Sequence, residues 1–141
     1  MEKRRGECAS VTLARTSIVT HLDNNFLIDA LVPGSTQEAQ LVSWLGTGET
    51  LGISAIAWGE FLCGPLSPAT EAFARSLFPG AEALERADAE KAAELFNLTG
   101  RRSRSYMDCC IAAVAIRAQA PLATSNRGDF MPMVAHGLVL A

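Results

Sequence analysis

Hydrophobic and polar residues along this chain form short blocks that predict strands and helices in alternation. Apolar, β-branched runs over 17–22, 51–54, 121–124 and 138–140 are typical of buried strands. Stretches with helical spacing lie between them. Because strands that alternate with helices form parallel sheets covered on both faces, we expect an α/β fold. The specific expectation is a three-layer α/β/α sandwich with four to five parallel strands.

The helical stretches carry start and stop signals. Helices are expected to begin at Asn24, at the capping box Ser35–Glu38, at Ser54, at Ser67 before Pro68, at Asp88 and at the capping box Ser105–Asp108. Residues 109–118 are apolar on nearly every side, which predicts a central, buried helix. A weak edge strand is expected at 83–86.

Length and composition are those of one folded domain. The chain has 141 residues, of which 49% are hydrophobic and 19% charged, and this excludes an intrinsically disordered chain. We expect a disordered tail over residues 1–16 and one domain over 17–141. The first residues are basic, but no apolar stretch of signal-peptide length follows, and no run is long enough to span a membrane. We therefore expect a cytoplasmic protein whose four cysteines are reduced.

Charge is distributed unevenly. The chain has 12 basic and 15 acidic residues, so a basic coat for nucleic acid is excluded, although a local patch or a bound cation is not. Residues 18–141 alone carry 8 basic and 13 acidic side chains, a net charge of −5. The useful question is whether these acids are scattered or converge.

Several acids stand where predicted elements begin or end. Asp23 directly follows the first strand, Glu60 lies in the helix after the second, and Asp108 stands at the start of the buried helix. Asp129 closes a turn after a later strand, and Asn126 lies in the same turn. Ligands of open parallel sheets bind beyond the carboxyl ends of the strands, so we expect these side chains to meet there.

Each acid also has an ordinary interpretation as a helix cap, a solvated residue or a turn former. Several carboxylates in one crevice are unfavourable without a cation. Mg²⁺ or Mn²⁺ takes oxygen ligands, polarises a phosphoryl oxygen and lowers the pKa of a bound water. The pattern therefore favours metal-dependent hydrolysis of phosphodiesters.

Three blocks of this sequence resemble the PIN domain, and most closely the VapC ribonuclease toxins of bacterial toxin–antitoxin pairs. They are 21–30, 54–64, and 108–115 together with 122–130. The resemblance covers about residue 17 to the C-terminus. It implies a parallel sheet flanked by helices and RNA cleavage that depends on Mg²⁺ or Mn²⁺.

The family pattern assigns roles to particular residues. Its first three acids fall on Asp23, Glu60 and Asp108, and its fourth falls on either Asn126 or Asp129. The resemblance implies that Asp23 and Asp108 are the main metal ligands, that Glu60 assists, and that the fourth residue acts through water. Asn24 stands where the family usually has Thr or Ser. An amide can donate and accept hydrogen bonds, but with a different geometry.

Substrate and partners follow from the same resemblance. The substrate would be RNA (tRNA, rRNA or mRNA), and four arginines near the acids are candidates for its phosphates, with a solvated loop as the alternative: Arg101, Arg102, Arg104 and Arg127. The resemblance further implies a homodimer and a VapB-like antitoxin that docks across an apolar groove near the active site.

Two other hypotheses belong to different classes. The first is a catalytically idle PIN-like module that binds RNA or protein, favoured by Asn24 and by the uncertain fourth acid. The second is a phosphate-receiver or nucleotide-binding α/β protein, which is disfavoured because the chain has no glycine-rich phosphate loop and no receiver-type lysine signature. Carboxylate-dependent binding of Mn²⁺ would separate the first from the nuclease.

Overall fold

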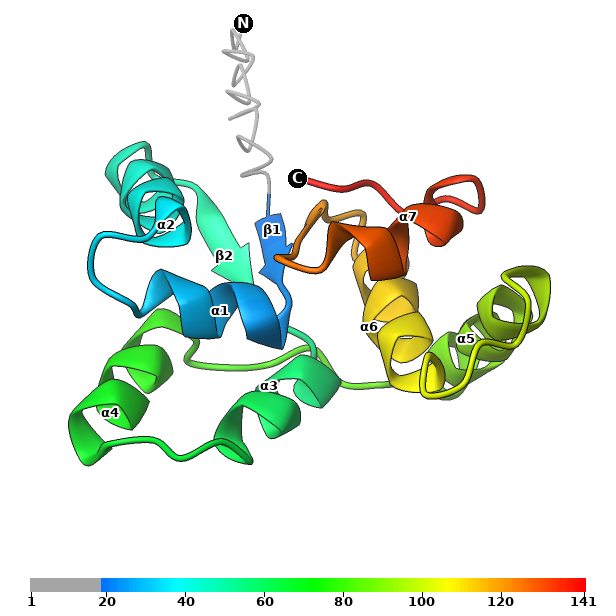
Figure 1. Ribbon diagram of the computed structural model, residues 1–141, viewed down its shortest axis with the longest axis horizontal. Helices are drawn as coiled ribbons and strands as arrows, with labels where there is room; N and C mark the ends of the chain where they lie inside the picture. The colour runs from blue at the N-terminus through cyan, green and yellow to red at the C-terminus, as the bar shows by residue number, and fades with distance from the viewer. Residues whose placement is uncertain (1–18) are drawn as a thin grey trace, which may run out of the picture.

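A computed structural model describes residues 19–141 and shows a small parallel sheet between helices (Figure 1). The elements are β1 (Val19–Leu22), α1 (Asn24–Ala30), α2 (Thr36–Gly46), β2 (Thr50–Gly52), α3 (Ala55–Leu62), α4 (Pro68–Leu77), α5 (Arg86–Leu98), α6 (Tyr106–Arg117), β3 (Leu122–Ala123) and α7 (Arg127–Val134). The tail predicted over 1–16 lies outside the described residues. Within 19–141, no helix has the length and apolarity needed to cross a membrane.

The sheet has the order β2-β1-β3, with both pairs parallel. A single parallel bridge joins Ser54 to Glu82 beyond β2, and another joins Leu122 of β3 to Leu140. The predicted α/β sandwich with a parallel sheet is thus confirmed. The outermost members of the predicted four- to five-stranded sheet are reduced to these bridges.

Helices cover the sheet on two sides (Figure 1). α1 and α2 pack together on one side, and α5 and α6 pack together on the other. The predicted central helix is α6, in which every residue over 109–115 is buried. α6 contacts α3, α5 and α7, and these contacts fix the position of its N-terminus.

The core joins these layers. Leu22, Phe61, Ile111, Leu122 and Phe130 come from five different elements and are all fully buried. Each such side chain contributes roughly 1.5–3 kcal/mol of apolar burial. The core therefore fixes the ends of β1, α3, α6, β3 and α7 relative to one another.

Some predicted helix starts are confirmed. The Ser54 hydroxyl accepts a hydrogen bond from the Ala57 N–H, at 3.1 Å, and Ser67 caps α4 in the same way. Ser35 caps α2, but the Glu38 carboxylate accepts from the Gly34 N–H, so only half of the expected capping box forms.

Other predicted helix caps are wrong. Asp23, not Asn24, caps α1, because its Oδ1 accepts from the Asn24 N–H. Ser105 makes no capping bond, since its backbone is already helical and its hydroxyl donates to the Arg102 carbonyl. Asp88 lies inside the first turn of α5, which begins at Arg86.

The structure differs from the sequence prediction at two further elements. The strand expected at 83–86 is absent, and this stretch leads directly into α5. Conversely, α7 occupies 127–134, where only a turn was expected. Gly128 and Pro132 conceal the helical pattern of α7, although both are accommodated in it.

Candidate active site

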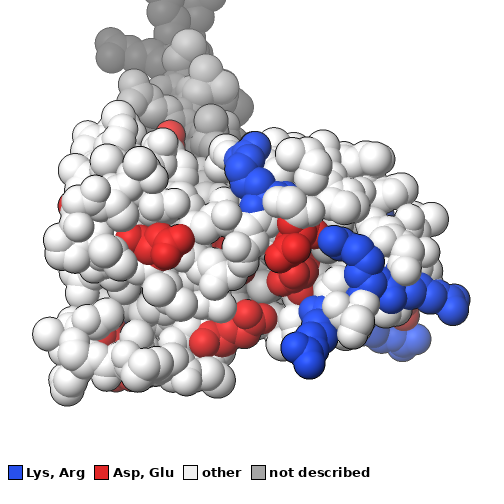
Figure 2. Space-filling view, viewed as in Figure 1, with Lys and Arg blue, Asp and Glu red and all other residues white. Residues whose placement is uncertain are grey.

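Four acidic side chains meet at the edge where the parallel strands end. Asp23 follows β1, Glu60 lies on α3, Asp108 in the first turn of α6 and Asp129 in the first turn of α7. The charges of the other three each raise the pKa of Asp108, so the structure brings together the acids singled out from the sequence. Figure 2 shows acidic side chains gathered near the middle of one face, beside Lys and Arg.

Asp23 is the most deeply buried of the four, with only 2% of its surface exposed. Its Oδ1 accepts from the Asn24 N–H at 2.8 Å, and its Oδ2 accepts from the Thr124 hydroxyl at 2.9 Å. Burial raises the pKa of Asp23, these two bonds lower it, and the charges of Glu60 and Asp129 raise it again. Burial has the largest effect, so the folded chain disfavours the ionised form of Asp23.

Asp108 is half-buried. Burial and the repulsion of Asp23, Asp129 and Glu60 raise its pKa to about 6, against the attraction of Arg102. A carboxyl with such a pKa is mostly ionised at neutral pH, and a positive charge placed beside it would stabilise this ionised form. The same positive charge would stabilise the three acids that repel Asp108.

Asn24 and Glu60 are directly bonded. The Asn24 amide donates to Glu60 Oε2 at 3.1 Å. Asn24 Oδ1 and Glu60 Oε1 are left buried, with no hydrogen-bond donor among residues 19–141. Unpaired buried acceptors are destabilising, and a cation or its water shell would satisfy both. The oxygen-rich donor set therefore fits Mg²⁺ or Mn²⁺.

The acids do not form a closed cage. Within residues 19–141, no group of three Asp, Glu, His or Cys side chains is arranged so as to hold a metal ion on its own. Mg²⁺ keeps several waters and needs only one or two carboxylates, so an open arrangement is compatible with it. Asp23 and Asp108 could hold such an ion, with Glu60 and Asp129 in support.

Asn126 and Asp129, the two candidates for the fourth site residue, are both exposed near the start of α7. The charge of Asp129 raises the pKa of both Asp23 and Asp108. Asn126 is uncharged, and its backbone N–H donates to the Thr124 hydroxyl at 3.0 Å. Asp129 thus acts on the carboxylates, whereas Asn126 helps to hold the turn.

Sequence reasoning missed Thr124. Its hydroxyl is buried, donates to Asp23 and accepts from Asn126, and so connects the end of β3 to the acid after β1. The available signal was a hydroxyl residue at the end of the strand predicted over 121–124. Without the register between β1 and β3, that signal could not be assigned.

The four arginines occupy different surroundings. Arg102 Nη2 donates to the Asp129 carbonyl at 2.7 Å, so it ties the loop before α6 to α7. Arg127 Nη1 donates to the Ala141 carbonyl at 2.8 Å. Arg101 is exposed and bonded to Asn97, and Arg104 is exposed, with a left-handed φ of 63°. Arg102 is the arginine most closely tied to the acids.

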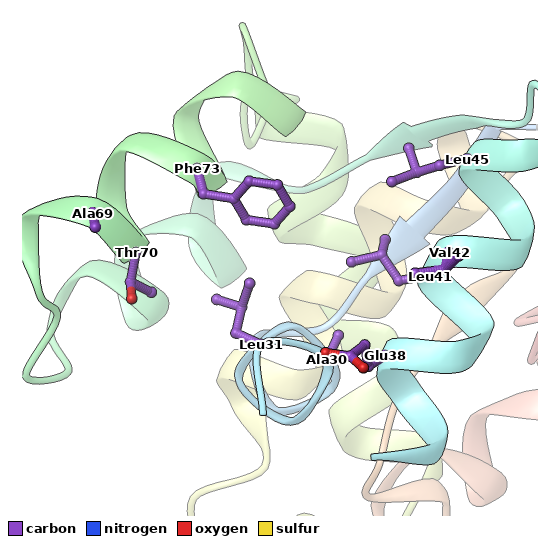
Figure 3. Close-up of a pocket in the computed structure, with 9 residues that line it drawn as sticks. All are labelled: Ala30, Leu31, Glu38, Leu41, Val42, Leu45, Ala69, Thr70 and Phe73. Atoms are coloured by element: carbon purple, nitrogen blue, oxygen red, sulfur yellow. The ribbon is translucent and has the colours of Figure 1, made fainter. Parts of the chain in front are cut away.

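An apolar groove of about 390 Å³ lies at the other end of α1 (Figure 3). Its lining comes from α1, α2 and α4: Ala30, Leu31, Glu38, Leu41, Val42, Leu45, Ala69, Thr70 and Phe73. Phe73 of α4 points into the space, toward Leu41 and Leu45 of α2. Val42 is 63% exposed, and Leu45 and Phe73 are each 46% exposed. Exposed apolar side chains that gather in a groove are typical of a docking surface.

Fold and site together define an α/β protein with coupled carboxylates at the carboxyl edge of a parallel sheet. The family model of the PIN domain matches residues 21–131, a stretch that contains all four acids. This chain belongs to the PIN domain family. No curated protein matches the sequence significantly.

Solved structures with the same fold include toxin–antitoxin proteins. VapBC2 from Rickettsia felis, bound to a DNA fragment from its promoter, superposes with a TM-score of 0.68 at 17% identity, covering 87% of this chain and 97% of that one. FitAcB from Neisseria gonorrhoeae gives 0.65 at 22%, covering 87% and 96%. A toxin–antitoxin complex from Klebsiella pneumoniae gives 0.64 at 24%, covering 79% and 89%. These likenesses establish the fold.

Proposed function

We propose that this PIN-domain protein is an endoribonuclease that depends on Mg²⁺ or Mn²⁺ and acts as the toxin of a toxin–antitoxin pair. One observation carries the nuclease proposal. Neighbouring carboxylates raise the pKa of Asp108 and of Asp23 at one edge, while two buried acceptor oxygens, on Asn24 and Glu60, have no donor among the described residues. A site so rich in negative charge is stabilised by a cation that can in turn bind phosphate.

The residues around the cation would have distinct tasks. When bound, the ion supplies Lewis-acid polarisation of a phosphoryl group and lowers the pKa of a water. Asp23 and Asp108 would hold it, and the Asn24 amide orients Glu60 through its 3.1 Å bond. Arg102, anchored on the Asp129 carbonyl, lies on the same edge and would attract the RNA backbone.

The partner proposal rests on the groove between α1, α2 and α4. The similar Klebsiella pneumoniae structure is a toxin–antitoxin complex. An amphipathic helix of an antitoxin would place its apolar face against Leu45 and Phe73, as in other helix-in-groove contacts. α1 runs from Asp23 at the acids to Ala30 at the groove, so a helix docked there would sit near the active site.

Two further parts of the proposal concern state and place. The resemblance to VapC toxins supports a homodimer, which sedimentation equilibrium of the purified chain would show. A cytoplasmic location is proposed because its RNA substrates are there and because Cys63, Cys109 and Cys110 form no disulfide with one another in the described part of the chain, which fits a reducing compartment.

The nuclease is tested by incubating the purified chain with total tRNA and rRNA and, separately, with single-stranded DNA. Cleavage of RNA with Mg²⁺ or Mn²⁺ is expected, with loss in EDTA and in Asp23→Asn and Asp108→Asn. Glu94→Gln, at an exposed position on α5, is the matched control and should retain activity. RNA that stays intact with metal would refute the enzyme, and cleavage that persists in Asp23→Asn would show a contaminant.

The antitoxin is tested by looking for a small reading frame immediately upstream of this gene and co-expressing its product with this chain. Co-expression should give a complex that inhibits cleavage, and Val42→Glu with Leu45→Glu should weaken it at least tenfold while leaving cleavage intact. Ser43→Glu, exposed on another part of α2, is the control. A complex of unchanged affinity in the double variant would place the partner elsewhere.

A further inference from the structure

A second pocket, of about 230 Å³, lies on the opposite face of α2 from the apolar groove. Its lining combines the aromatic residues Phe26 and Trp44 with the polar residues Gln37, Gln40, Thr124 and Arg127. Pockets for drug-sized ligands run from about 300 to 1,000 Å³, so this one suits a single small ring system.

The aromatic part of this pocket is held in place by the core. The Phe26 and Trp44 rings lie with centroids 5.5 Å apart and planes inclined by 31°. Phe26 is buried, whereas Trp44 is only partly so. A partly open indole that is backed by a buried ring is a ready stacking platform for an unpaired base, because every base has a π-face.

The polar part has the chemistry that reads base edges. Gln40 is exposed and makes no side-chain hydrogen bond within the described residues, whereas the Gln37 carboxamide accepts from the Thr36 hydroxyl at 3.0 Å and donates to Ser125 at 3.4 Å. A carboxamide can donate and accept at once, and it pairs with the edge of a base in this way. Arg127, whose Nη1 donates to the Ala141 carbonyl at the pocket, adds a positive charge that can attract a neighbouring phosphate.

The pocket adjoins the acids through one residue. Thr124 lines it and also donates to Asp23 at 2.9 Å. A base seated between Trp44 and the two glutamines would therefore be separated from Asp23 by Thr124. A phosphate attached to that nucleotide can reach the carboxylate edge.

We propose that this pocket binds one unpaired nucleobase of the RNA, next to the cleaved phosphate, and thereby contributes to the cleavage preference. The inference rests on the proposed function in that it assumes an RNA substrate. Trp44 supplies the stacking surface, Gln37 and Gln40 read the base edge, and Arg127 holds the adjoining phosphate.

The binding step is tested without metal by fluorescence. Trp58 stacks on Phe61, away from the pocket, so Trp58→Phe leaves Trp44 as the only tryptophan. In EDTA, short single-stranded oligoribonucleotides should quench Trp44, and oligomers of the same length with abasic sites should bind at least tenfold more weakly. Equal quenching by both would overturn the proposal, because phosphate alone would then account for binding.

Variants of the exposed glutamine test the reading of the base. Gln40→Ala should flatten the preference among the four nucleotides at the cleaved position severalfold, with little change in thermal stability. Ser43→Ala, one turn along the same helix, is the matched control. If Gln40→Ala changes neither the nucleotide preference of cleavage nor the quenching of Trp44 by oligoribonucleotides, the inference is overturned.

The two proposals fail in different ways. Base-dependent quenching in a protein that cleaves no RNA would leave the pocket standing and remove the nuclease. Metal-dependent cleavage with no Trp44 response and no effect of Gln40→Ala would leave the nuclease standing and remove the pocket.

Discussion

The Thr124 hydroxyl donates a 2.9 Å hydrogen bond to Oδ2 of the buried Asp23. The two residues are 101 positions apart in sequence and meet because β1 and β3 are neighbouring parallel strands. This bond lowers the pKa of Asp23, which burial raises. It thus helps to keep the deepest acid of the site ionised.

Thr124→Val should weaken binding of Mn²⁺ roughly tenfold, because a hydrogen bond to a charged group is worth about 1.5–3 kcal/mol. Losing the bond raises the pKa of Asp23 further, so protons compete better and the deficit should be larger at pH 6 than at pH 8. Titration calorimetry at the two pH values measures this. Thr124→Ser keeps the hydroxyl and should behave like the parent; a deficit independent of pH would contradict the account.

Asp108→Asn should abolish cleavage yet stabilise the metal-free fold at neutral pH. The pKa of Asp108 is about 6 in the folded chain against an ordinary value of 3.8, so the folded state binds this proton more tightly. Between about pH 4 and pH 6 the free energy of unfolding therefore falls as pH rises, and above pH 6 the full penalty is present. Since the side chain is half-exposed, solvent screening reduces the penalty to about 1 kcal/mol.

Urea unfolding in EDTA measures this difference. The variant should exceed the parent by about 1 kcal/mol at pH 7.5 and match it near pH 4, where both side chains are neutral. Excess Mn²⁺ should stabilise the parent but not the variant. A variant that is less stable than the parent at pH 7.5 would show that Asp108 is structurally favourable rather than strained.

Asn24→Ala should reduce kcat about tenfold with little change in KM, since it removes the 3.1 Å amide bond that orients Glu60. Asn24→Ser carries the hydroxyl that the wider family usually has here, and should recover part of the rate. Steady-state kinetics on one RNA substrate separate kcat from KM. Equal rates for Asn24→Ala and the parent would mean that Glu60 needs no such support.

An ion pair away from the site joins an exposed arginine to a buried aspartate. Arg117 at the end of α6 contacts Asp88 of α5 at 2.9 Å, and Asp88 is 2% exposed. Asp88→Ala should reduce the free energy of unfolding by about 1 kcal/mol, because it also removes the capping bond that Asp88 Oδ2 accepts from the Glu85 N–H at the start of α5. Glu90→Ala breaks the exposed Arg86–Glu90 pair and should change it by less than 0.5 kcal/mol. Equal effects in urea unfolding would contradict this contrast.

Sequence patterns predicted much of the fold because its signals are local. The apolar run over 109–115 predicted the buried helix, and Ser54 and Ser67 predicted the starts of α3 and α4. α7 was missed because Gly128 and Pro132 oppose a helix locally, and packing of Phe130 and Met133 into the core overrides them.

The candidate site, like the fold, could be predicted from the sequence only in part. Asp23, Glu60 and Asp108 could be placed because acids at the ends of parallel strands converge by topology. The hydrogen bonds from Asn24 to Glu60 and from Thr124 to Asp23 could not, because they depend on strand register and on rotamers set by distant packing. The pocket beside Trp44 likewise exists only once α2 lies against β3 and α7.

Titration of Mn²⁺ into the metal-free protein, with calorimetry, tests the central claim most directly. The account predicts saturable binding to the parent and to Glu94→Gln, with at least tenfold weaker binding to Asp23→Asn and Asp108→Asn, since each removes one carboxylate of the coupled group. Parent protein that binds no Mn²⁺, or binds it equally well in Asp23→Asn, would contradict the claim and leave an idle PIN module as the better description.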